Sequence, residues 1–433
     1  MSPSSNIWKP FTISGVSSDP LTVKSGKGLY LELEDGRRIK DMISSWWVNL
    51  HGHAHPYIAK AIADQAQLLE HVIFADFTHD PAEKLAENLL RVSNRSFDKV
   101  FFSDNGSTAV EVALKMALQY WVNRGEPKRH KIIAFEGAYH GDTLGAMSTG
   151  ARSIFNEAFN EWMFTVERVP FPETWIGDEH QETKESAVLK QIRKMLEQDD
   201  HQIAALIIEP LIQGAGGMRM CSEAFVHNLV ELVRGFGVLV IFDEVMTGFG
   251  RTGSLFAYQK TGVVPDLICL SKGITGGFLP LAVTMVQKHI FKAFDEPDAQ
   301  KTFWHGHSYT ANPLGCAAAL ASLVLTEKNR VAYETMESWH IDGISDLVST
   351  GVTHHERICG TIMAVDVRMD VDSSGGYLSE VGPLIKKKSL EHGVLIRPLG
   401  NVLYVMPPYC ITKEELSDVY QELTKILTEL KIK

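Results

Sequence analysis

Two short apolar stretches between residues 238 and 277 constrain the fold of this chain most, because each ends in one charged residue. Val238–Phe242 is predicted to form a buried strand that delivers Asp243. Leu267–Leu270 is predicted to form a second such strand that delivers Lys272. In parallel α/β sheets the carboxyl ends of strands open onto the ligand crevice, so both charged side chains are expected in one cleft.

A lysine and an aspartate placed in this way suit pyridoxal phosphate. The lysine amine can form a Schiff base with the aldehyde, and the carboxylate can keep the pyridine nitrogen protonated, so that the ring withdraws electrons. For Lys272 or Asp243 alone, a buried ion pair or an unrelated strand-end charge is the preferred interpretation. The glycines at 273, 276 and 277 favour the cofactor, because they let the backbone approach a flat ring.

A candidate phosphate site precedes this region. Lys99–Ser103 is predicted to be a strand and Thr108–Trp121 a helix, with Gly106 and Ser107 at the turn between them. Free backbone N–H groups, a hydroxyl and the positive end of the helix dipole would meet there, which favours an anion. A plain serine N-cap remains the alternative.

Strands and helices alternate from about residue 98 to residue 272, which predicts an α/β fold with a largely parallel sheet. Lys131–Phe135 is one further strand, and Tyr139 beyond it could stack on a cofactor ring. His140 is interpreted as an ordinary turn residue. Another strand, IAALII, ends at Glu209, and residues 21–43 are predicted to form a small antiparallel meander.

Other residues are candidates for a substrate pocket. Trp46 and Trp47 are adjacent, and in extended chain they would point in opposite directions, so at least one could line a pocket. Burial of both in separate clusters is the alternative. Arg397, near Tyr404 in an apolar segment, is either a carboxylate clamp or part of a structural ion pair.

Composition excludes several classes of function. The 433 residues carry a formal net charge of −11, which argues against nucleic acid or an anionic membrane as a partner. No run of eighteen apolar residues and no signal-peptide pattern occurs, so a cytoplasmic protein is expected. The five scattered cysteines suggest reduced thiols, and the HGHAH segment at 51–55 lacks the pattern of a metal site, so no metal is expected. No GxGxxG follows an early strand, which excludes an NAD-binding dehydrogenase.

The segments DEVMTGFGRTG at 243–253 and SKG at 271–273 resemble the class III (ω-amino) aminotransferases of the fold-type I pyridoxal phosphate enzymes. The resemblance extends over nearly the whole chain. SSWW at 44–47, GAYHGDTLGAMS at 137–148, IIEPLIQGAGGMRM at 207–220 and IRPLGNVLYVMPPY at 396–409 are most similar to the class III enzymes that transaminate 8-amino-7-oxononanoate in biotin synthesis.

The resemblance implies an architecture. It consists of a large domain with a mostly parallel seven-stranded sheet and a smaller α+β domain built from both termini. Residues 51–314 would form the large cofactor-binding domain, and residues 1–50 and 315–433 the small one. It also implies a homodimer with active sites at the subunit interface.

The resemblance implies residue roles as well. Lys272 would bind pyridoxal 5'-phosphate covalently and shuttle protons, Asp243 would pair with the ring nitrogen, and Tyr139 would stack on the ring. The phosphate would be bound by Gly106 and Ser107, together with Ser308 from the neighbouring subunit. The substrate pocket would comprise Trp46, Trp47, Asp142, Arg251, Gly306, Arg397 and Tyr404, with Arg397 on the substrate carboxylate.

The implied reaction is a ping-pong transamination with adenosylmethionine as the amino donor. Phe11 stands where adenosylmethionine-using relatives commonly have tyrosine, and Gly306-His307-Ser308 is similar to relatives that use lysine, so lysine is the alternative donor. Another class III ω-aminotransferase is a further alternative. Ala215 stands where enzymes for α-carboxylates often carry glutamate, which counts against those substrates. A catalytically silent relative is disfavoured, because both Lys272 and Asp243 are present.

Overall fold

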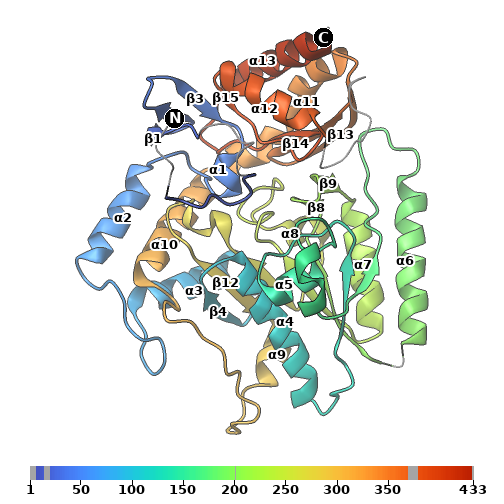
Figure 1. Cartoon of the computed structure of the whole chain (residues 1–433). Helices are drawn as coiled ribbons and strands as arrows, with labels where there is room; N and C mark the ends of the chain where they lie inside the picture. The colour runs from blue at the N-terminus through green and yellow to red at the C-terminus, as the bar shows by residue number, and fades with distance from the viewer. Residues whose placement is uncertain (1–5, 14–19, 200, 369–378, 432–433) are drawn as a thin grey trace.

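A seven-stranded sheet lies at the centre of the computed structural model, which describes residues 6–13, 20–199, 201–368 and 379–431 (Figure 1). All strands run parallel except β12, which is antiparallel to both of its neighbours. The strands follow one another in the order β4 (Lys99–Ser103), β12 (Ala282–Val286), β11 (Leu267–Leu270), β10 (Leu239–Asp243), β7 (Ile203–Ile208), β5 (Lys131–Phe135) and β6 (Glu167–Val169). The predicted α/β fold is confirmed.

Helices cover both faces of this sheet, which explains why its central strands, β7, β10 and β11, are almost entirely apolar. Alternate residues of β10 belong to different packed clusters, with Val240 and Phe242 on one face and Leu239 and Ile241 on the other. The first face is covered by α3 (Asp80–Val92), α6 (Gln181–Gln198) and α7 (Glu223–Gly235). The second is covered by α4 (Gly106–Asn123) and α9 (Lys288–Lys292).

Segments from both ends of the chain meet in a second region. The predicted meander is present as β1 (Val23–Lys27), β2 (Tyr30–Leu33) and β3 (Arg38–Asp41), and β15 (Val394–Leu395) pairs with β3 in parallel. This pairing is consistent with a domain built from both termini, whose boundaries at 1–50 and 315–433 stay a prediction. Several predicted residues in these ranges lie outside the described part of the chain.

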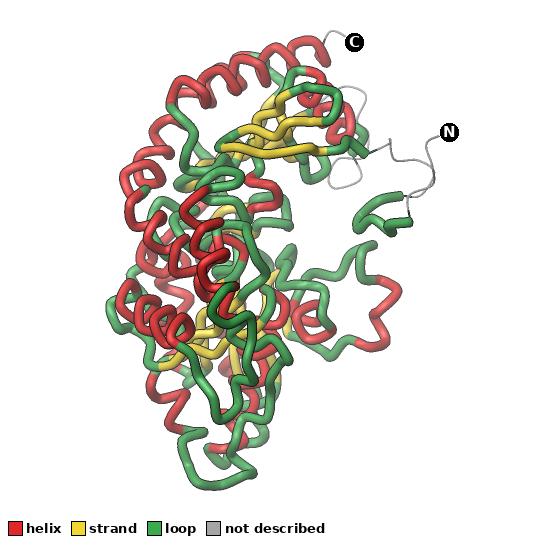
Figure 2. The backbone as a smooth tube through the Cα atoms, turned by 90° about the vertical axis from the view of Figure 1, so that its left-hand side faces the viewer, coloured by secondary structure: helices red, strands yellow, loops and turns green. Residues whose placement is uncertain are grey.

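A three-stranded antiparallel sheet completes the C-terminal part (Figure 2). It consists of β13 (Thr353–Cys359), β14 (Ile362–Val367) and β16 (Val402–Val405), and the helices beside it are α11 (Arg330–Ser349), α12 (Val381–Glu391) and α13 (Lys413–Lys431). The remaining elements are α2 (Pro56–Ala66), α5 (Leu144–Thr149), η1 (Glu157–Trp162), β8 (Ile212–Gln213), β9 (Arg219–Met220), α8 (Ala257–Thr261), η2 (Lys272–Thr275) and α10 (Pro313–Lys328).

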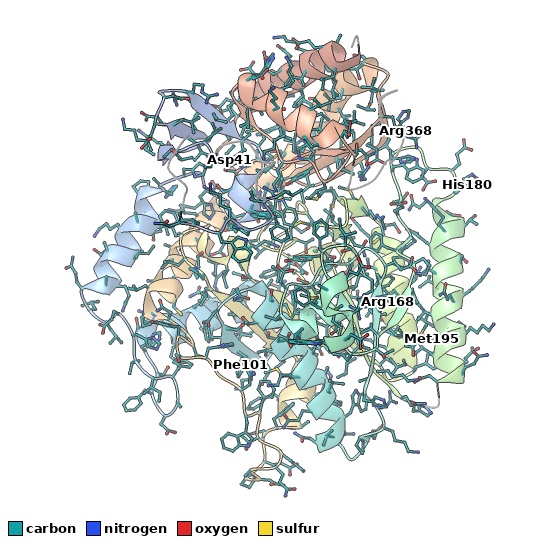
Figure 3. The ribbon with its side chains drawn as sticks, in the orientation of Figure 1. Asp41, Phe101, Arg168, His180, Met195 and Arg368 are labelled. Atoms are coloured by element: carbon teal, nitrogen blue, oxygen red, sulfur yellow. The ribbon has the colours of Figure 1, made fainter. Side chains whose placement is uncertain are left out.

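The two adjacent tryptophans are not in extended chain. They lie in α1 (Ser44–Trp47), an irregular four-residue turn that two residues separate from β3 and its last residue, Asp41 (Figure 3). Trp46 is half-exposed and Trp47 is buried. The prediction that the two side chains point in opposite directions is therefore wrong, because a tight turn lets successive side chains reach the same space.

No helix in the described part of the chain is long and apolar enough to cross a membrane.

Candidate functional site

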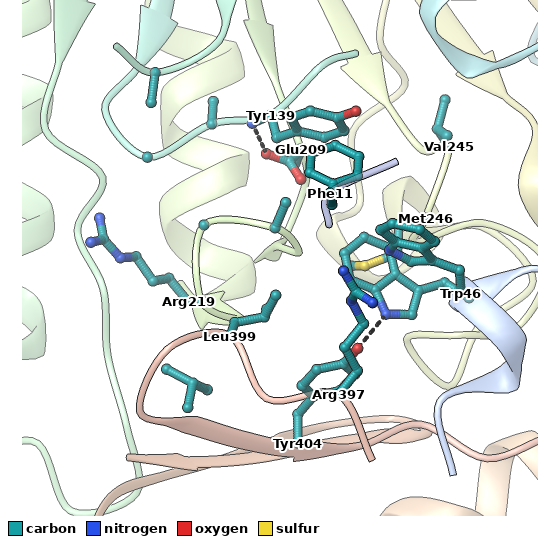
Figure 4. Close-up of a pocket in the computed structure, with 18 of the residues that line it drawn as sticks. Phe11, Trp46, Tyr139, Glu209, Arg219, Val245, Met246, Arg397, Leu399 and Tyr404 are labelled. Carbon is teal, nitrogen blue, oxygen red and sulfur yellow. Dashed lines mark hydrogen bonds between the residues drawn. The ribbon is translucent and has the colours of Figure 1, made fainter. Parts of the chain in front are cut away.

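A cavity of about 2490 Å³ opens at the carboxyl ends of the parallel strands. Its floor comes from residues that directly follow β4, β5, β7, β10 and β11, as expected for a sheet of this kind. Its outer wall comes from distant parts of the chain, namely α1 and the C-terminal segment that carries Arg397 and Tyr404 (Figure 4). The cavity is larger than a typical small-molecule site of about 300–1,000 Å³, so it has room for a cofactor and a substrate together.

Asp243, the last residue of β10, is buried at the floor of this cavity. One carboxylate oxygen lies 2.7 Å from Nδ1 of His140, and the other accepts the backbone N–H of Val245 at 3.1 Å. Burial lowers the pKa of His140, but the hydrogen bond to Asp243 and the charge of Asp243 together raise it by more, so the net shift is upward. His140 is therefore a partner of Asp243 and not the ordinary turn residue that the sequence suggested.

Lys272 lies in the same floor, at the start of the 3-10 turn η2. Burial lowers the pKa of its amine, although the charges of Asp243 and Glu209 oppose this shift. A lysine whose neutral form is favoured in this way can act as a nucleophile and as a proton acceptor. Lys272 has a φ of 44°, in the left-handed region that a non-glycine residue adopts at a cost, which is typical of functional sites.

The amino end of α4 forms the predicted anion site. Asn105, not a serine, caps the helix by accepting the N–H of Thr108 at 3.1 Å, so Ser107 is left to line the cavity. Ser107 Oγ accepts the N–H of Asp142 at 3.2 Å. A Cβ on Gly141 would lie 2.1 Å from Ser107 Oγ, and one on Gly106 would lie 2.6 Å from Val245.

These contacts test whether the residues fit the cofactor that the resemblance implies. Pyridoxal phosphate needs an anion site, a carboxylate and an amine in one cavity, and the amino end of α4, Asp243 and Lys272 supply all three. The two glycines keep the backbone close to the anion site, which a side chain at either position would obstruct. The residues present fit the group.

Tyr139 lies beside this floor and is hydrogen-bonded to Glu209, which directly follows β7 (Figure 4). Glu209 accepts the N–H of Tyr139 and the N–H of Gly214, each at 3.0 Å, so one carboxylate joins two loops of the cavity. The Tyr139 hydroxyl donates to Asp142 at 3.0 Å. Burial raises the pKa of Glu209 to about 7, although the charge of His140 and the two backbone hydrogen bonds oppose the shift.

Both tryptophans of α1 line the cavity, and each lies against a cation. Arg397 lies 4.5 Å from the centre of the Trp46 ring, and Lys272 Nζ lies 4.9 Å from the centre of the Trp47 ring. The indole N–H of Trp47 donates to the hydroxyl of Tyr404 at 3.0 Å (Figure 4). No carboxylate pairs with Arg397 within the part of the chain that the structure describes.

Three residues of the predicted site lie outside this cavity. Arg251 is fully buried and donates to the backbone oxygens of Pro407 at 3.0 Å, Asn49 at 3.3 Å and Trp47 at 3.4 Å. It therefore supports the pocket wall from behind in this chain. Gly306 and Ser308 lie in a surface loop, where the Ser308 carbonyl oxygen is 2.5 Å from Nε2 of His71.

Two functional candidates were not identified from the sequence. His140 and Glu209 each directly follow or lie near a strand end, but so do many residues without a function. The signal that distinguishes them is burial together with contact to another candidate, His140 to Asp243 and Glu209 to the backbone of Tyr139. That information is available only once the chain is folded.

Comparison with known protein families and sequences gives one consistent result. Residues 13–427 match the family model described as aminotransferase class-III. An adenosylmethionine-8-amino-7-oxononanoate aminotransferase of Synechococcus elongatus is 53% identical over 98% of this chain and 99% of its own length. The protein of that name in Geobacter sulfurreducens is 38% identical over 97% of this chain and 95% of its own length.

Solved structures agree with this result. An amine transaminase from an uncultivated Pseudomonas species, in a PLP-bound form, superposes with a TM-score of 0.92 at 28% identity and covers 100% of both chains. An adenosylmethionine-8-amino-7-oxononanoate aminotransferase from Methanocaldococcus jannaschii superposes with a TM-score of 0.90 at 32% identity, over 98% of this chain and 97% of its own.

The raised pKa of Glu209 predicts a specific pH dependence of stability. An acid whose pKa rises from 4.5 to about 7 on folding binds more protons in the folded state, so its contribution to stability falls as pH rises across that range. Relative to a Glu209→Gln variant, the protein should lose about 3 kcal/mol of unfolding free energy between about pH 4.5 and about pH 7. Urea titrations of both proteins across this range measure the difference.

The matched control is Glu34→Gln, which removes an exposed carboxylate in a turn of the meander. Its difference curve against the parent protein gives the baseline for this comparison. A curve for Glu209→Gln that follows this baseline would show that Glu209 ionises as easily in the folded protein as in the unfolded chain.

Proposed function

Because this chain belongs to the class III aminotransferase family, we propose that it transfers an amino group to the 7-oxo carbon of 8-amino-7-oxononanoate and so forms 7,8-diaminononanoate in biotin biosynthesis. The chain is a pyridoxal phosphate-dependent aminotransferase. The assignment of the substrate rests on the names of relatives that match over nearly the full length of the chain.

One observation supports this substrate most directly. Arg397 has an aromatic neighbour, Trp46, but no carboxylate partner among the described residues, and it lines the same cavity as Lys272. An unpaired cation in the cavity that also holds the reacting amine suits a substrate with a carboxylate at one end and a ketone further along. Trp46, Trp47 and Leu399 provide the apolar walls that a chain of methylene groups requires.

The cofactor would be held by residues at or beyond the ends of four strands, β4, β5, β10 and β11. Gly106 and Ser107 would bind its phosphate at the amino end of α4, Tyr139 would flank its ring, and Lys272 would hold it covalently. Asp243 would keep a proton on the ring nitrogen. When bound, pyridoxal phosphate takes up the amino group of a donor, withdraws electrons from the reacting carbon and passes the amino group to a ketone.

The residues of the chain carry out the proton transfers. Lys272 Nζ would take the proton from the donor carbon that bears the amino group, and later return a proton to the former ketone carbon. Burial favours the neutral amine that this role requires. His140 holds the Asp243 carboxylate at 2.7 Å, so that it stays aimed into the cavity, and the tryptophan walls exclude water.

Adenosylmethionine is the donor that we propose, since the relatives carry it in their names. Lysine is a second candidate that one observation favours. Phe11 lines the cavity, with its ring 5.6 Å from that of Trp46 and 6.3 Å from that of Phe155, so an apolar edge faces the place where adenosylmethionine-using relatives commonly offer a tyrosine hydroxyl.

The active form proposed here is a cytoplasmic homodimer with Ser308 of the partner subunit at the phosphate. Two neighbouring loops expose large apolar side chains, with Leu68, Ile73 and Phe77 on one and Trp304 and Tyr309 on the other. The loops touch, because the rings of His71 and Tyr309 lie 5.3 Å apart. An apolar surface of this kind is typical of a subunit interface, and a second copy of the chain is the occupant that we propose.

The visible absorbance of the bound cofactor tests the substrate and the donor. We expect 7,8-diaminononanoate and adenosylmethionine each to convert the holoenzyme to its amine form in the absence of a second substrate. Conversion by the diamine and lysine, but not by adenosylmethionine, would keep the acceptor and change the donor. If the diamine leaves the spectrum unchanged while another ω-amine converts it, the proposed acceptor is wrong.

The carboxylate role of Arg397 predicts a selective defect. Arg397→Ala should raise KM for 8-amino-7-oxononanoate about 10- to 100-fold, because a charge-assisted hydrogen bond is lost. The donor half-reaction should be almost unchanged. Arg38→Ala is a matched control, because Arg38 also lies over an aromatic ring, Tyr30 at 4.3 Å, but outside the cavity. Equal defects in both half-reactions would contradict the assignment.

Sedimentation velocity of the purified holoenzyme tests the dimer. We expect one species with the mass of two 48.2 kDa chains at micromolar concentration. A stable monomer that keeps full activity would overturn both the dimer and the proposed place of Ser308, because that residue does not line the cavity of its own chain.

A further inference from the structure

The turn that carries Trp46 and Trp47 is strained. Ser44, Ser45 and Trp47 have φ values of 49°, 61° and 70°, in the left-handed region that non-glycine residues rarely adopt. Three such residues within four positions persist only where the surroundings hold the backbone in place. The groups that hold this turn therefore determine where the two indole rings lie.

A buried carboxylate holds the first half of the turn. Asp41 is fully buried, and its oxygens accept the N–H of Ile43 at 3.2 Å and the hydroxyl of Ser45 at 2.9 Å. A third donor, Nε2 of His53, lies 2.9 Å from Oδ2. Burial raises the pKa of Asp41, but the hydrogen bonds from His53 and Ser45 together lower it by more, so the net shift is downward and favours the charged form.

His53 is itself oriented by Asn49, which lies two residues after the turn. The side-chain amide of Asn49 lies 3.1 Å from Nδ1 of His53, so Nδ1 accepts and Nε2 carries the proton that Asp41 accepts. The backbone of His53 is paired with Gly28 in both directions, at 3.1 and 2.7 Å. Asp41 before the turn and Asn49 after it are thus joined through one imidazole ring.

Other polar contacts hold the start and the end of the turn. The guanidinium of Arg251 donates to the carbonyl oxygens of Trp47 and Asn49, and the hydroxyl of Ser44 donates to that of Met406 at 2.8 Å. These contacts anchor the ends of the turn. Asp41 adds two contacts within the first half of the turn, to Ile43 and to Ser45.

The turn delivers two rings to two cations of different function. Trp46 lies against Arg397, the proposed carboxylate clamp, and Trp47 lies against Lys272 while its N–H reaches Tyr404. A change in the turn would therefore move both ends of the substrate site together. Asp41 itself does not line the cavity.

We propose that Asp41, oriented by His53, is a positioning residue that sets the places of Trp46 and Trp47 and thereby the affinity of the pocket for an apolar chain with a terminal carboxylate. The ligand class rests on the proposed function, whereas the effect on the two rings does not. Asp41 is assigned no part in the chemistry at Lys272.

Fluorine NMR of holoenzyme labelled with 5-fluorotryptophan tests the placement directly. Trp46→Phe and Trp47→Phe variants assign the two signals among those of the eight tryptophans. Asp41→Asn replaces a carboxylate oxygen by an NH2 group, which cannot accept the hydrogen bonds of Ser45 and His53. We expect the signals of Trp46 and Trp47 to shift or broaden in this variant, while those of the other tryptophans are unchanged. Asp64→Asn is the matched control, because Asp64 is an exposed aspartate paired with Lys60 on α2.

A ligand titration tests the consequence. Nonanoate, a chain of nine carbons with one carboxylate, should quench tryptophan fluorescence of the parent holoenzyme, and its Kd should rise about tenfold or more in Asp41→Asn but not in Asp64→Asn. In Asp41→Asn the KM for 8-amino-7-oxononanoate should rise by a similar factor, while kcat changes little. Should Asp41→Asn fail to fold, Ser45→Ala and His53→Leu each remove one donor to Asp41, and His53→Gln, which keeps an N–H, should restore binding in part.

The possible failures are distinguishable. If the parent enzyme binds no long-chain acid, the proposed substrate is wrong, and the NMR signals still decide whether Asp41 places the rings. If Asp41→Asn leaves both signals and the nonanoate Kd unchanged, Asp41 does not position the pocket. A general loss of all tryptophan signal dispersion, repeated in Ser45→Ala, would make Asp41 a residue of overall stability only and would overturn the proposal.

Discussion

The hydrogen bond between Asp243 and His140 is the interaction on which the site depends. A carboxylate buried at the end of a central strand is unstable unless a donor compensates it, and His140 does so at 2.7 Å. This contact links the ends of β10 and β5, which are separated in the sheet by β7. The charge of Asp243 also opposes the downward shift that burial imposes on the pKa of the Lys272 amine, so this buried pair influences a second group of the floor.

Most of the sheet could be predicted from sequence because its strands are buried on both faces. Lys99–Ser103, Lys131–Phe135 and Leu267–Leu270 have the predicted bounds, and the fold class is confirmed. Because the carboxyl ends of parallel strands meet at one edge of a sheet, Asp243 and Lys272 could be predicted to share one cavity, and both line it. These inferences succeed because they depend only on hydrophobic runs and on the direction of the strands.

The parts that could not be predicted depend on irregular backbone. The Ser44–Trp47 turn has left-handed residues without glycine, so neither its shape nor the contact of both indoles with the cavity follows from propensity. Arg251 is a further example, because a motif residue near the site was expected in the pocket, whereas the fold buries it against three carbonyl oxygens. The prediction that His140 is an ordinary turn residue was also wrong, since only the tertiary structure reveals its contact with Asp243.

The proposed catalytic residues and the proposed substrate wall come from different parts of this chain. Asp243 is the last residue of β10, and Lys272 follows β11 at the start of η2, so both are anchored by strands that pack on both faces. Trp46 and Arg397 stand on short segments near opposite ends of the sequence, which are held by a few hydrogen bonds. Small changes in those bonds can move the wall without touching the floor. A family that keeps one reaction and varies its substrates requires this separation, because specificity can then change at little cost to catalysis.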